Sequence, residues 1–173
     1  MKTPTGPLLS LAILLICAAA PFAQSSHLLF VLERNTNSNS VYYEARVGSD
    51  SLLDARQPIH AYWIMWEKDP TGKKHEELTF LENEKAFGVK VKQAPTRNCV
   101  WFSIVPLPNR PIKVSLQDET AVAETVIDGQ FCVLEKVRIN ATKKQLLPHV
   151  NYIDLFGKNP KTGEEHYERI AGK

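Results

Sequence analysis

The chain has 173 residues and a nearly balanced charge, with 21 Lys and Arg against 19 Asp and Glu. This balance argues against the strongly basic surface that binds nucleic acid or an anionic membrane, so we expect no nucleic-acid partner. A chain of this length fits one domain that can bury a substantial core.

The N-terminus has the order of a secretory signal peptide. Lys2 supplies a positive charge, an apolar run extends from Leu8 to Ala20, and small residues follow it. This run is shorter than the roughly 20 apolar residues that cross a membrane. We therefore expect a signal peptide over residues 1–23 and one β-rich domain over 24–173, without a transmembrane segment. The protein would be exported, to the periplasm or outside the cell.

Short strand-like runs separated by turn-forming residues follow this segment. Residues 27–34 and 41–47 flank the polar stretch 35–40, a pattern typical of a hairpin with a solvated loop. Residues 59–68 form the next predicted strand. The stretch 69–72 has Pro and Gly at the positions that a type I turn favours.

The predicted strand at 59–68, IHAYWIMWEK, is apolar on both faces. Alternation places Trp63 on one face and Tyr62 and Trp66 on the other. Such a strand lies either between two covered faces of a core or along the wall of a ligand cavity. We favour core packing, because a helix follows closely enough to cover one face.

That helix is predicted to be about two turns long and to need packing for its stability. Thr79 and Glu82 have the spacing of a capping box, in which each side chain bonds the other's backbone N–H. Gly88 occupies the position where a left-handed residue often ends a helix. Phe80 and Phe87 lie two turns apart on one side, so we expect both to pack on the preceding strand.

Further strand-like runs cover residues 99–105, 112–117, 120–127, 130–139, 150–156 and 165–170. Asp128 and Gly129 give the strongest short hairpin signal and predict that Val126 pairs with Phe131. Eight or nine short strands joined by hairpins, with one short helix, predict a mainly β single domain. Its architecture would be an antiparallel β-barrel or a β-sandwich.

The three cysteines bear on export and on stability. Cys17 follows Ile16, where a lipoprotein signal needs a small residue, so we favour an apolar signal residue over a lipid anchor. An even count in the remaining exported chain suggests a disulfide between Cys99 and Cys132. The alternative is two separate buried thiols that pack as small hydrophobic residues.

No sequence motif of catalysis or metal binding stands out. The five histidines are scattered, and neither a G-x-S-x-G elbow nor a Gly-rich phosphate loop occurs. We therefore expect no metal, no cofactor and no catalytic residue, and we favour a protein that is not an enzyme. A hydrolase whose site is assembled from separate strands is the alternative.

The leading hypothesis is an exported β-domain that binds a small apolar or amphipathic ligand, or a protein of the cell envelope. Ligand pockets are walled by aromatic side chains, with a few polar groups that orient the ligand. The stretch 35–40 would then be a sugar- or ion-binding loop, although we favour a solvated loop. A structural module with a solid core is a further alternative. The predicted ligand wall comprises Tyr62, Trp63, Trp66 and Trp101, and the predicted polar anchors are Arg34 and Arg46.

Four stretches carry a resemblance to a known family: FVLERNTNSNSVYYEARV, PIHAYWIMW, ELTFLENEKAFG and VNYIDLFGKNPKTGEEHYERI, in this order. Together they resemble an exported bacterial family, domain of unknown function 4833. The resemblance covers nearly the whole chain after the signal segment. It implies a bacterial, exported, single-domain protein, and it implies no catalytic residue.

Overall fold

A computed structural model describes residues 26–96, 98–117, 120–142 and 149–172, so the predicted signal peptide lies outside the described residues. The prediction of a mainly β fold with one short helical segment is confirmed. The strands are β1 (Ser26–Arg34), β2 (Ser40–Arg46), β3 (Ile59–Ile64), β4 (His75–Glu77), β5 (Val89–Thr96), β6 (Cys99–Ile104), β7 (Ile112–Gln117), β8 (Thr120–Ile127), β9 (Gln130–Thr142), β10 (His149–Lys158) and β11 (Glu165–Ala171).

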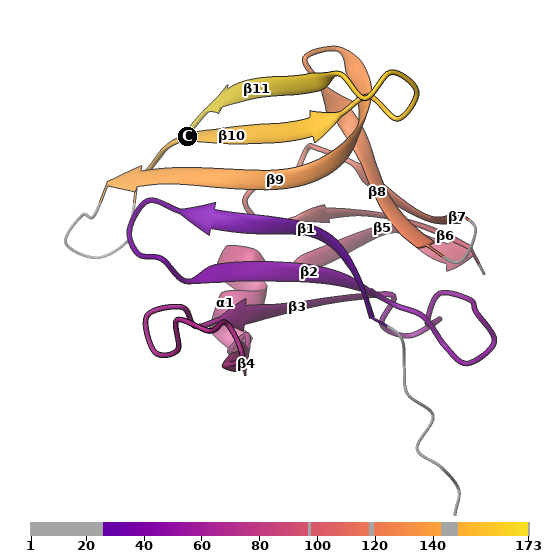
Figure 1. The fold of residues 1–173 in the computed structure, drawn as a ribbon, viewed down its shortest axis with the longest axis horizontal. Coiled ribbons are helices and arrows are strands. Elements are labelled where there is room, and N and C mark those ends of the chain that lie inside the picture. The colour runs from indigo at the N-terminus through magenta and orange to yellow at the C-terminus, as the bar shows by residue number, and fades with distance from the viewer. Residues whose placement is uncertain (1–25, 97, 118–119, 143–148, 173) are drawn as a thin grey trace, which may run out of the picture.

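Nine of these strands follow one another in a single curled sheet, in the order β4-β3-β2-β1-β9-β8-β7-β6-β5. Figure 1 shows this sheet as an open half-barrel. The prediction of a closed barrel is wrong, because within the described chain β4 pairs only with β3 and β5 only with β6. An all-antiparallel sheet is also wrong, because β1 and β9 pair in parallel.

Strand β9 joins two parts of the sheet. On one edge, residues 130–133 pair with β8 and residues 136–139 pair with β1. On its other edge, β9 pairs with β10, which in turn pairs with β11. Strands β3, β2, β1, β9, β10 and β11 are therefore consecutive neighbours, and we call them the six-strand layer (Figure 1).

The core fills the inside of the curl. Phe30 of β1 stacks on Tyr43 of β2 with ring centroids 4.5 Å apart, and on Phe102 of β6 at 6.5 Å. The other fully buried large side chains are Leu32, Ile104, Ile112, Ile127, Leu134, Leu155, Val41, Val100 and Val114. They come from both halves of the sheet, so this core holds the curl together.

The helical segment comprises α1 (Phe80–Glu82) and a π-helical turn, η1 (Asn83–Phe87). The predicted capping box is confirmed. The Glu82 amide donates to Thr79 Oγ1 at 3.3 Å, and the Thr79 amide donates to Glu82 Oε2 at 2.9 Å. The predicted left-handed end at Gly88 is wrong, because this glycine is extended, with φ −66° and ψ 166°. A Cβ there would lie 1.8 Å from the Asn83 carbonyl oxygen, so glycine is needed for close approach.

The two phenylalanines of this segment differ in their surroundings. Phe87 is 8% exposed and packs edge-on against Trp63 with centroids 5.0 Å apart. Phe80 is 83% exposed. The expectation that both pack on β3 is therefore wrong for Phe80. The wider π-helical turn between them breaks the 3.6-residue period on which that expectation rests.

The hairpin at Asp128 and Gly129 is confirmed. Both residues have positive φ, 50° and 74°, as a two-residue type I′ turn requires. Val126 pairs with Phe131, as predicted. The local sequence therefore fixes both the turn and the register of β8 against β9.

Both cysteines in the described residues are free. Cys99 lies on β6 and Cys132 on β9, with β7 and β8 between them in the sheet. The structure therefore supports two separate thiols over the predicted disulfide. Burial raises the pKa of the Cys132 thiol, as expected of a structural cysteine. No helix in the described ranges is long and apolar enough to cross a membrane.

Candidate functional site

A groove of about 1130 Å³ lies on the face of the six-strand layer that points away from the core. Its floor is a row of directly paired residues from five strands: Tyr42, Val31, Lys136, Phe156 and Tyr167. On β1 and β2 the neighbours of these residues, Phe30, Leu32, Val41 and Tyr43, point the opposite way and are buried in the core. We call this feature the outer groove.

The floor of the outer groove combines rings and a cation. Phe156 and Tyr167 lie side by side with ring centroids 5.3 Å apart. The Lys136 ammonium lies 5.2 Å from the centre of the Phe156 ring, within the range of a cation–π contact. The floor therefore presents flat apolar surface next to a charged group.

The charges of the groove are largely paired with one another. Glu33 accepts hydrogen bonds from Arg138 at 3.0 and 3.2 Å, and the Lys136 ammonium lies 3.8 Å away from it. Glu135 pairs with Lys158 at 3.0 Å. Partly exposed pairs such as these add little stability. Their consequence here is a groove without a large excess of either charge.

Asp154 lies beside this floor and is buried. Arg169 donates to it at 2.7 and 3.0 Å, and the Tyr167 hydroxyl donates at 2.9 Å. The hydrogen bonds from Arg169, and then from Tyr167, hold the pKa of Asp154 below its ordinary value. This network fixes the Tyr167 ring at the end of the groove.

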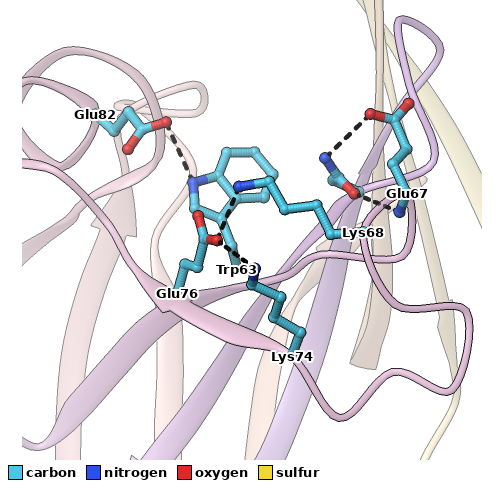
Figure 2. Close-up of polar contacts among 7 residues, drawn as sticks. Trp63, Glu67, Lys68, Lys74, Glu76 and Glu82 are labelled. Atoms are coloured by element: carbon cyan, nitrogen blue, oxygen red, sulfur yellow. Dashed lines mark hydrogen bonds and ion pairs between the residues drawn. The ribbon is translucent and has the colours of Figure 1, made fainter.

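Two loops form the rim of the outer groove near β2 and β3. The loop before β2 is joined to the loop after β3, because the Glu67 amide donates to Asn39 Oδ1 at 3.0 Å and Asn39 donates back to the Glu67 carboxylate at 3.5 Å. Figure 2 shows the same loop after β3 held by Lys68 and Lys74, which both reach Glu76, at 2.8 and 3.7 Å. These hydrogen bonds and ion pairs hold the two loops of the rim in place.

Trp66 lies in the rim loop after β3 and lines the groove. Its ring lies against Gly72, where a Cβ would be only 2.5 Å from the indole. Gly72 also has a positive φ of 71°, which closes the turn that begins at Asp69. Glycine is therefore needed at this position for two reasons: the turn requires a positive φ, and the Trp66 ring packs where a Cβ would lie.

Arg34 connects the groove to the core. Its guanidinium lies 4.5 Å from the Trp63 ring centre and 5.3 Å from that of Phe87, and it donates to Asn37 at 2.9 Å. The buried Nε makes no hydrogen bond with any described residue. Burial lowers the pKa of Arg34, and the nearby Glu82 acts in the opposite direction.

The structure separates the residues of the predicted ligand wall. Trp66 lines the outer groove, whereas Trp63 belongs to the core and donates from its indole to Glu82 at 3.2 Å (Figure 2). Tyr62 is buried on the outer face and donates to Glu44 at 2.5 Å; burial and this bond raise the pKa of Tyr62. Trp101 lies on β6, in the other half of the sheet.

The two predicted anchors are also separated. Arg34 lines the groove, but Arg46 lies at the far end of β2 and bonds Gln57. Of the six residues predicted to bind a ligand, the structure brings Arg34 and Trp66 to one groove, and their role in binding stays a prediction.

Sequence reasoning did not identify the floor residues or His166. His166 lines the groove, and its buried Nε2 makes no hydrogen bond within the described part of the chain. The alternating sequence EHYERI gave a signal for a strand at 165–170, but not for its neighbours in space.

The groove offers stacking surfaces and hydrogen-bonding groups. No set of three or more His, Cys, Asp or Glu among the described residues is arranged to hold a metal ion.

The family model described as Domain of unknown function (DUF4833) matches residues 30–169. Neither the curated proteins nor the solved structures contain a match. The matched range runs from β1 to β11 and includes every strand that forms the floor of the outer groove. The resemblance identified in the sequence is thereby confirmed, and the chain belongs to the DUF4833 family.

Proposed function

We propose that the protein is a binding domain whose outer groove holds a carbohydrate chain. The observation that carries this proposal is the combination, in one groove, of aromatic rings with hydroxyl and amide side chains. Tyr42, Phe156, Tyr167 and Trp66 provide the rings, and Asn37, Ser38 and Ser40 provide the polar groups. A sugar ring has an apolar face that stacks on an aromatic ring and hydroxyls at its edge that need such partners.

The polarity of the groove favours this ligand over a purely apolar one. Apolar ligands bind in enclosed, mostly apolar cavities that remove them from water. The outer groove is open, and the ion pair between Glu33 and Lys136 lies within it. An uncharged, hydroxyl-rich ligand suits it better, because Glu33, Glu135 and Lys136 already take part in ion pairs.

The length of the floor supports an oligomer as the ligand. Tyr42 on β2 and Tyr167 on β11 are separated by four strand spacings, which amounts to about 19 Å at roughly 4.8 Å per strand. A single sugar would contact only part of this row. We therefore propose that several linked sugar units lie across the strands.

The proposed place of action is outside the cytoplasm, in the periplasm or beyond, where carbohydrate chains of the cell envelope are accessible. Support comes from the signal-like order of residues 1–23. Mass spectrometry of the protein purified from its native host should find a mature N-terminus near Gln24. An intact N-terminus on protein found in the cytoplasmic fraction would contradict export.

Titration calorimetry tests the ligand. The probes are tetramers of N-acetylglucosamine and of glucose, with decanoate as an apolar probe. Binding of at least one tetramer and not of decanoate is expected. Binding of decanoate alone, or of no probe, would contradict the proposal.

Two tryptophan variants locate the binding surface. Trp66→Ala should weaken tetramer binding by about tenfold, roughly 1.4 kcal/mol, because it removes a ring from the groove. Trp101→Ala is the matched control, since Trp101 is also half-buried but lies in the other half of the sheet. Equal losses in both variants would place the ligand elsewhere.

A further inference from the structure

Strand β11 is a free edge of the six-strand layer. In the described part of the chain it pairs only with β10, through seven consecutive pairs without a bulge, from Glu165 with Lys158 to Ala171 with Tyr152 (Figure 1). The other edges differ: β4 has three residues, and the pairing of β5 is interrupted twice. Shortness and bulges protect an edge from pairing with another chain, and a long regular edge lacks this protection.

We propose that β11 pairs in antiparallel fashion with β11 of a second copy, around a two-fold axis at Tyr167. An antiparallel edge-to-edge dimer needs its axis normal to the sheet, so each register is centred on one residue. Centring on Tyr167 places Glu165 opposite Arg169 of the second copy and His166 opposite Glu168 of the second copy. Tyr167 then lies opposite itself.

The charges of β11 select this register over its neighbours. Centring the pair on Glu165, Glu168 or Arg169 would place that charged residue opposite itself. Centring on His166 would place Glu164 opposite Glu168. Like charges directly opposite each other destabilise a pair of strands, whereas opposite charges stabilise it. Among the registers centred on residues 165 to 169, only the one centred on Tyr167 avoids every like-charge pair within β11, and it sets Glu165 against Arg169.

The side chains needed for this pairing are accessible. The Glu165 side chain is 84% exposed and that of Arg169 is 50% exposed. Arg169 uses its Nε and one Nη to hold Asp154, and a guanidinium has five N–H groups, so it can also bond Glu165 of the second copy. Glu168 lies on the opposite face, where it binds Arg110 and the Asp128 amide.

The dimer would join two six-strand layers into one continuous sheet. Because Tyr167 lies at both the axis and the end of the outer groove, the two grooves would meet end to end. The dimer is inferred from the regular edge and the charge pattern of β11, and this inference does not depend on which ligand the groove binds.

Sedimentation velocity over a range of concentrations tests the interface. The mature wild-type protein is expected to behave as a reversible dimer. Glu165→Arg turns two symmetry-related attractive pairs into repulsive ones, so the dimer dissociation constant should rise at least about tenfold. Glu164→Arg makes the same charge change opposite Ile170 of the second copy, so it should leave the dimer dissociation constant unchanged. Circular dichroism checks that both variants fold. A wild-type monomer at every concentration, or equal effects of the two variants, would overturn the proposal.

Cysteine cross-linking tests the register. Tyr167→Cys places two thiols directly opposite each other at the axis, so mild oxidation should yield a covalent dimer. Ile170→Cys places the two thiols six residues out of register, so the same oxidation should yield no covalent dimer. Cross-linking at position 170, or at neither position, would overturn the register.

Discussion

At the scale of single residues, Trp63 connects the sheet to the helical segment. Its ring packs against Phe87 from η1 and under the Arg34 guanidinium from β1, and its indole N–H donates to Glu82 from α1. Strand β1 and the helical segment of α1 and η1, which are distant in sequence, therefore meet at one side chain of β3. The helical segment has no fully buried residue in α1, so its position depends on these contacts.

Substitution of the two phenylalanines tests this arrangement. Phe87→Ala should lower the free energy of unfolding by about 3–5 kcal/mol, because it leaves a cavity beside Trp63. Phe80→Ala is the matched control in the same segment and should cost less than about 0.5 kcal/mol, since its side chain is exposed. Urea denaturation measures both. Similar losses for the two variants would contradict the packing.

The buried Asp154 predicts a dependence of stability on pH. Hydrogen bonds from Arg169 and Tyr167 lower the pKa of Asp154 in the folded state, while the unfolded value is about 3.9. A pKa that is lowered in the folded state stabilises the fold at pH values above the unfolded-state pKa. This contribution is lost as the pH falls through the folded-state pKa.

Asp154→Asn should therefore lower the free energy of unfolding by about 1–3 kcal/mol at neutral pH. The difference from the wild type should shrink below about pH 4. Asp128→Asn, in an exposed turn that suits either residue, should have little effect at any pH. Denaturation curves at several pH values measure the difference, and a gap that stays constant or widens in acid would refute the assignment.

At the scale of elements, Gly88 decides how the helical segment joins β5. Gly88→Ala should destabilise the fold by about 1–3 kcal/mol, because a methyl group would collide with the Asn83 carbonyl. Gly48→Ala is the control, since a Cβ there meets the end of the Asp50 side chain, which can move. Thermal unfolding compares the two. A Gly88→Ala variant as stable as wild type would show that the segment does not end in this close contact.

The elements that the sequence predicted well are those set by neighbouring residues. Turn chemistry determines the hairpin at Asp128 and Gly129, and the capping box of Thr79 and Glu82 needs only a spacing of three. The π-helical turn was missed, because an α-helical period was applied to residues 80–87. The parallel pairing of β1 with β9 was missed, because it joins segments about a hundred residues apart with no local signal.

At the scale of the whole molecule, the outer groove depends on the topology of the sheet. Its floor collects one residue from each of five strands, and the central contact, Val31 with Lys136, exists only because β9 pairs with β1. The sequence suggested a wall built largely from residues 62–66, where neighbouring side chains alternate between faces. Trp66 reaches the groove because it follows the end of β3, in the rim loop.

The measurement that tests the central claim most directly is ¹⁹F NMR of the protein with all three tryptophans replaced by fluorotryptophan. The resonances of Trp63, Trp66 and Trp101 report on the core, the outer groove and the other half of the sheet, respectively. Titration with the N-acetylglucosamine or glucose tetramer should shift the Trp66 resonance and leave that of Trp101 unchanged. A shift of Trp101 alone, or no shift with either tetramer, would contradict carbohydrate binding in the outer groove.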